Sequence, residues 1–149
     1  MADNLKLLRF FFVLLAIFVL GRWALGLAGA SYDATHQVFS VVTLAVLSSA
    51  HHAFIVRRFL SGGFKRAATL GATIGVISQL LILASTLVSY LGGMETFWNH
   101  PRALNVTETI GLGQAMQARF VGLIVNTILN VIAASIGYAA AGAVPKGAR

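Results

Sequence analysis

Four long apolar runs constrain this chain more than any other feature of its sequence. A helix needs about 20 apolar residues to cross the hydrocarbon core of a bilayer. Runs of this length lie at about residues 10–28, 37–60, 67–91 and 118–144. Charged residues make up only 10% of the chain, whereas soluble domains contain about a quarter. The sequence therefore predicts an all-α integral membrane protein, a single domain over residues 1–149 with four transmembrane helices in an antiparallel bundle.

The basic residues predict how this bundle is oriented. With both termini in the cytoplasm, eight Lys and Arg residues lie on the cytoplasmic side, and Arg22, Arg102 and Arg119 lie on the other. Such an excess is the usual positive-inside pattern. The eight are Lys6, Arg9, Arg57, Arg58, Lys65, Arg66, Lys146 and Arg149. We expect a multi-pass protein of the cell membrane, in bacterial terms an inner membrane, with one external loop at about 92–117.

The first run also has features of a signal peptide. Lys6 and Arg9 precede an apolar stretch, and the small residues 28–30 offer a cleavage site before Ser31. Cleavage would leave three spans. The apolar run continues beyond Arg22 and is long enough to cross a bilayer, so we expect the first span to be retained.

The third and fourth runs each have a helical face of small and polar residues. In lipid, such faces mark the side that packs against other helices, because small residues allow close approach and amides hydrogen-bond across the interface. The predicted interhelical packing residues are Gly71, Gly75, Gln79, Gly122, Asn126 and Asn130. Gln79 and Asn130 lie near the middle of their runs, so we expect a hydrogen bond between them, with Asn126 as a second partner.

Polar residues of the second run fall on one side of a continuous helix, if that helix begins early enough. They are Asp33, His36, Ser40, Thr43 and His51. Two interpretations remain open. Histidine titrates near neutral pH and hydroxyls hold water, so this stripe is a candidate proton path. The alternative is a buried seam that hydrogen-bonds to neighbouring helices, which is favoured because no Asp or Glu lies in mid-membrane.

Metal and haem sites have weak support. Asp33 and His36, with Glu95 or His100, offer zinc ligands at the outer end, but their spacing is loose. A b-type haem needs two axial ligands, and only the second run carries histidine, so Met116 or a dimer mate would have to supply the other. The absence of cysteine excludes thiolate zinc sites and iron–sulfur clusters. We expect no metal and no cofactor.

Arg22 is an isolated charge in the outer half of the first run. We expect its long side chain to reach the outer headgroups, a position known as snorkelling. The alternative is an ion pair with Asp33 or Glu108.

The sequence contains few residues in arrangements that support catalysis, so we expect that this protein is not an enzyme. It has no phosphate-binding loop, no nucleophile elbow and no paired carboxylates within a span. The net charge of +7 is explained by the excess of Lys and Arg in cytoplasmic segments. The sequence lacks the basic face with interleaved aromatic residues that is typical of nucleic-acid binding, so we expect none.

Three functional hypotheses follow. The first is a homo-oligomer or an accessory subunit of a larger membrane complex, because polar helix faces can bind partner helices. The second is a small transporter or proton-conducting protein that uses the polar stripe. The third is an outer-surface protein that binds metal or b-haem.

Overall fold

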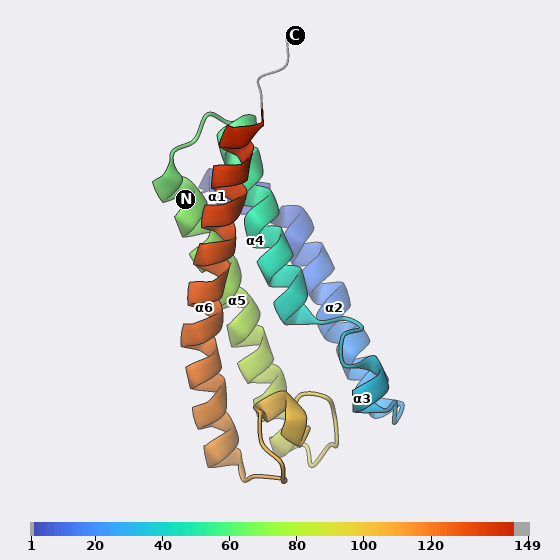
Figure 1. The fold of residues 1–149 in the computed structure, drawn as a ribbon. Coiled ribbons are helices and arrows are strands. Elements are labelled where there is room, and N and C mark those ends of the chain that lie inside the picture. The colour runs from blue at the N-terminus through green and yellow to red at the C-terminus, as the bar shows by residue number, and fades with distance from the viewer. Residues whose placement is uncertain (1, 145–149) are drawn as a thin grey trace.

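The structure, a computed structural model, describes residues 2–144 (Figure 1). Within this range all regular structure is helical, without strands. The helices are α1 (Ala2–Leu7), α2 (Arg9–Leu27), α3 (Tyr32–Thr35), α4 (Val41–Arg58), α5 (Phe64–Leu91), the 3-10 helix η1 (Pro101–Leu104) and α6 (Leu112–Ala143). Helices α2, α4, α5 and α6 run along the bundle and reverse direction at each connection (Figure 1).

The bundle has two chemically different ends. The beginning of the chain, the end of α6 and the α4–α5 connection lie together (Figure 1). We call this the basic end, because it carries Lys6, Arg9, Arg57, Arg58, Lys65 and Arg66. The opposite end carries α3 and the connection 92–111, and we call it the loop end.

Three of the described helices are long and apolar enough to cross a membrane: α2, α5 and α6. This confirms the prediction of an all-helical chain with several helices that can cross a membrane. Helix α4 is not among the three, because its 18 residues include two histidines and two arginines, which lower its hydropathy.

Two helices begin several residues away from the start of the apolar run that corresponds to them. Helix α6 begins at Leu112 rather than near 118, because Gln114 and Gln117 are polar but still favour a helix. Helix α4 begins at Val41 rather than near 37. Phe39 adopts a left-handed backbone with φ of 53°, which ends the preceding turn. Ser40 then caps α4, and its Oγ accepts a hydrogen bond from the backbone N–H of Thr43 at 3.4 Å.

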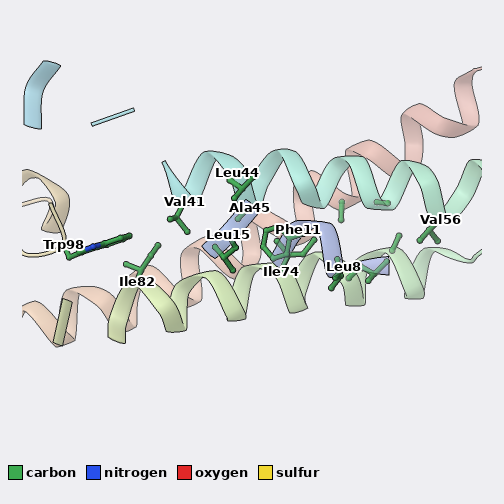
Figure 2. Close-up of a cluster of buried hydrophobic side chains, with 14 residues drawn as sticks. Leu8, Phe11, Leu15, Val41, Leu44, Ala45, Val56, Ile74, Ile82 and Trp98 are labelled. Atoms are coloured by element: carbon green, nitrogen blue, oxygen red, sulfur yellow. The ribbon is translucent and has the colours of Figure 1, made fainter. Parts of the chain in front are cut away.

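A buried apolar cluster holds α2 against α4 and α5. Figure 2 shows that it runs from Trp98 and Ile82 at one end to Leu8 and Val56 at the other. The side chain of Phe11 is 1% exposed in the middle of this cluster. The outward side of α6 is apolar instead, as a lipid-facing surface requires. Its exposed residues include Phe120, Val121, Ile124, Ile128, Ile132 and Ile136.

Glycines allow α6 to approach both α4 and α5. A methyl group added at Gly71 would lie 2.7 Å from the carbonyl oxygen of Asn130, and one added at Gly75 would lie 2.9 Å from Cα of Thr127. Real side chains do not tolerate such distances, so backbone meets backbone here. Two of the three glycines predicted for interhelical packing, Gly71 and Gly75, thus face α6.

Candidate functional site

The polar stripe predicted for the second run does not exist as one helical face. Asp33 belongs to α3, His36 follows it, and the turn at Phe39 separates both from α4. The expectation of a continuous helix from 33 to 51 is therefore wrong. The reason is local, because a left-handed residue cannot continue an α-helix.

The five stripe residues also have different surroundings. Asp33 forms an exposed ion pair with Arg102. Thr43 and His51 point away from the bundle on α4. The buried histidine of α4 is His52, whose Nδ1 lies 2.7 Å from the carbonyl oxygen of Ser48. Only the other two residues, His36 and Ser40, line the same cavity.

The predicted hydrogen bond between Gln79 and Asn130 is absent from the described residues. Instead, Ser49 Oγ of α4 donates to Oδ1 of Asn130 at 2.7 Å, and Asn130 Nδ2 donates to the carbonyl oxygen of Asn126 at 2.7 Å. The register of the antiparallel pair explains the difference. Gly75 faces Asn130, so Gln79, one turn further along α5, lies beside Gly122.

Arg22 is neither snorkelling nor paired with an acid. Its side chain in α2 is buried, and Nη1 donates to the carbonyl oxygen of His36 at 2.9 Å. Its guanidinium carbon lies 5.3 Å from the ring centre of Trp98 and 5.5 Å from that of Phe97. These rings contribute cation–π attraction in place of a carboxylate. Both sequence-based expectations for this residue are wrong, because the connections after α2 and α5 fold over it.

Arg119 of α6 joins the loop end to the bundle with three hydrogen bonds. Nε donates to Oγ1 of Thr86 at 2.9 Å, Nη1 to the carbonyl oxygen of Ala103 at 3.0 Å, and Nη2 to that of Trp98 at 2.6 Å. The planar fork of a guanidinium suits such divergent acceptors. The side chain therefore fixes the connection 92–111 to α5 and α6.

Arg22 and Arg119 line one cavity of about 200 Å³ at the loop end, together with Arg102. The three residues come from α2, η1 and α6, which are far apart in the sequence. The other polar residues that line this cavity are Tyr32, His36, Gln37, Ser40 and Asn105.

This cavity has an excess of positive charge. Among the printed pairs of described side chains, the salt bridge between Arg102 and Asp33 is the one that involves a residue of this cavity. Arg22 and Arg119 hydrogen-bond only to carbonyl and hydroxyl oxygens, which are neutral. A charge withdrawn from water usually has a counter-charge, since desolvation without one is costly. Two guanidinium groups here lack such a partner within the described chain.

A second cavity of about 240 Å³ adjoins the first. The two share Arg119 and Asn105, and the second extends to Gln79, Gly122 and Asn126. Polar space therefore leads from the loop end toward the middle of the bundle. The sequence predicted Gln79 and Asn126 at helix interfaces and placed Arg119 on the outer side, but it assigned Arg119 to no site, although an arginine within an apolar run was a usable signal.

The metal ligands proposed for the outer end do not assemble. His36 and His100 both stack on the ring of Tyr32, with centroids 5.7 and 4.2 Å away. Over residues 2–144, no group of three or more potential His, Cys, Asp or Glu ligands is present. The residues proposed for an outer zinc site are therefore not brought together.

Comparison of the chain with family models, curated proteins and solved structures finds no match.

Proposed function

We propose that this chain is a four-span protein of the cell membrane, with α4 as the fourth crossing. Helix α4 lies along α5 and α6, and its 18 residues correspond to about 27 Å. Polar side chains of α4 have hydrogen-bond partners, as a membrane-spanning position requires. Ser49 is bonded to Asn130 inside the bundle, and Arg57 donates to the carbonyl oxygen of Tyr138 at 3.0 Å near the basic end.

Charge asymmetry supports a cytoplasmic location for the basic end. Six Lys and Arg residues lie there, whereas the loop end carries three arginines (Arg22, Arg102 and Arg119) and three acids (Asp33, Glu95 and Glu108). By the positive-inside rule, both termini are then cytoplasmic and the cavity opens toward the outside.

Labelling of single cysteines tests this topology directly, because the natural chain contains none. We expect Ala34→Cys and Thr107→Cys to react with a membrane-impermeant maleimide in intact cells, and Ser61→Cys to react only after permeabilisation. Ala34 and Ser61 flank α4 and are exposed. Equal reactivity of these two positions in intact cells would show that α4 does not cross the membrane.

We further propose that the cavity binds a small oxyanion, such as phosphate, sulfate or a short carboxylate. The observation that carries this proposal is the pair Arg22 and Arg119, which line one cavity without a carboxylate partner. Guanidinium groups bind carboxylate and phosphate oxygens with paired, charge-assisted hydrogen bonds. A volume of about 200 Å³ suits a small ion rather than a nucleotide.

Salt-dependent unfolding of the purified protein tests the anion site. We expect phosphate, sulfate, acetate or succinate to stabilise the protein more than chloride at equal ionic strength. Saturation about 100-fold above Kd corresponds to about 2.7 kcal/mol. The effect should be lost in Arg22→Gln and partly kept in Arg22→Lys.

Lys65→Gln is the matched control, because it removes the same charge at an exposed position of α5 at the basic end. It should respond to anions as the natural protein does. Titration calorimetry on folded Arg22→Lys provides a second measurement if Arg22→Gln does not fold. The proposal fails if no oxyanion exceeds chloride, or if Lys65→Gln loses the response equally.

The other functional hypotheses have gained no support. The small and polar faces of α5 and α6 that suggested partner helices lie largely within this bundle, at Gly71, Gly75 and Asn130. Assembly into a homo-oligomer or larger complex stays a prediction. Proton conduction also stays a prediction, but the continuous stripe on which it was based is absent.

A further inference from the structure

A groove at the basic end combines positive charge with apolar walls. Its volume is about 520 Å³, and it lies at the opposite end of the bundle from the arginine cavity. The residues that line it come from α1, α2, the α4–α5 connection and α5. They are Lys6, Leu7, Arg9, Phe10, Leu60 and Arg66.

The cations of this groove differ from the other basic residues nearby. Arg57 and Arg58 donate to backbone carbonyl oxygens of Tyr138 and Val144, at 3.0 and 3.1 Å. By contrast, Lys6 and Arg9 have no hydrogen-bond or salt-bridge partner among residues 2–144. Both side chains are exposed, so their charges are available to a bound anion.

Arg66 is the third cation of the groove and connects it to α1. Its Nε donates to Oδ1 of Asn4 at 3.0 Å, which holds the start of the chain beside α5. The other nitrogens of the guanidinium have no partner within the described chain. The acids Asp33, Glu95 and Glu108 belong to α3 and the connection 92–111, at the loop end of the bundle.

The apolar part of the groove faces outward. Phe10 is 67% exposed, and Leu60 is 44% exposed. Along α2, exposed apolar residues continue from Phe10 through Val13 and Ile17. A ligand here therefore contacts cations at the end of the bundle and an apolar surface along α2. A site of this kind is complementary to an amphiphile with an anionic headgroup.

We propose that this groove binds an anionic phospholipid of the leaflet at the basic end. Lys6, Arg9 and Arg66 contact its phosphate, and its acyl chains lie along Phe10, Val13 and Ile17. Basic pockets between membrane helices suit such headgroups. The lipid site does not depend on the oxyanion site, because the two share no residue.

Native mass spectrometry of the detergent-purified protein tests the proposal, with phosphatidylglycerol as the probe and phosphatidylcholine as the neutral comparison. We expect phosphatidylglycerol to bind more tightly than phosphatidylcholine. Lys6→Gln and Arg9→Gln should each weaken its binding about fivefold. Neither side chain has a hydrogen-bond or salt-bridge partner in the described part of the chain, so thermal unfolding without added lipid should be unchanged for both variants.

Lys65→Gln is again the matched control, since Lys65 is adjacent to Arg66 and exposed but does not line the groove. It should bind phosphatidylglycerol as the natural chain does. An equal loss in Lys65→Gln would indicate general surface charge rather than a site and would overturn the proposal. It would also be overturned by equal affinity for phosphatidylcholine. Glycerol phosphate that binds as tightly as the lipid would identify a site for soluble phosphate instead.

Discussion

Gly137→Ala is expected to lower the free energy of unfolding by about 2 kcal/mol or more, although it adds one methyl group. The methyl group would collide with the carbonyl oxygen of Ala50 and lie 2.7 Å from its carbonyl carbon. These are backbone atoms of α4, so relief requires the two helices to separate. Close backbone approach drives helix association in lipid, and a shift here weakens contacts along α4 and α6. Unfolding in mixed detergent micelles measures the loss.

Gly122→Ala is the matched control in the same helix. The nearest atoms to a methyl group at Gly122 are the side-chain atoms Nδ2 of Asn126 and Oε1 of Gln79, each 3.7 Å away. Such distances are ordinary van der Waals contacts. Alanine favours a helix over glycine by about 1 kcal/mol, so this variant should be equally or more stable. Equal stabilities for the two variants would contradict the close crossing of α4 and α6.

Arg119→Met is expected to destabilise the protein by about 3 kcal/mol and to release the connection 92–111. The change removes the donors to Thr86, Ala103 and Trp98. Hydrogen bonds from charged groups are each worth about 1.5–3 kcal/mol, and a carbonyl left without a donor adds a desolvation cost. Removal of a partly buried charge offsets part of this loss. Detergent unfolding and tryptophan emission, which should shift to the red as Trp98 becomes exposed, measure the effect.

Two further variants distinguish the effect of the three hydrogen bonds of Arg119 from the effect of its positive charge. Arg119→Lys keeps the charge but cannot reach three divergent acceptors, so we expect it to be nearly as destabilised as Arg119→Met. Gln117→Met, at an exposed position of the same helix, should be neutral. Full stability of Arg119→Lys would mean that the charge matters and the hydrogen-bond geometry does not.

The helices were predictable because their signal is local. Helix α2, predicted at about 10–28, lies at Arg9–Leu27, and α5, predicted at about 67–91, ends at Leu91 as expected. Long apolar runs are compatible with few structures other than membrane helices. The start of a helix differs from the start of its apolar run where polar residues are helical, as at Gln114, or where one backbone angle ends a turn, as at Phe39.

The partners of the polar residues were not predictable in the same way. Gln79 and Asn130 are both near mid-helix, but the register at Gly71 and Gly75 places Gln79 beside Gly122. Asn130 instead accepts a hydrogen bond from Ser49 of α4. A helical wheel gives the face on which a residue lies but not its height against the neighbouring helix. That height depends on where glycines let two backbones meet.

Sequence alone determined the helical membrane class and the concentration of basic residues near one end, because hydropathy and charge are sums over neighbouring residues. Tertiary structure decided which charges lie together. Arg22, Arg102 and Arg119 are far apart along the chain, and only the folding of two connections over the end of the bundle places them around one cavity. Their convergence depends on contacts between distant segments, which no local pattern encodes.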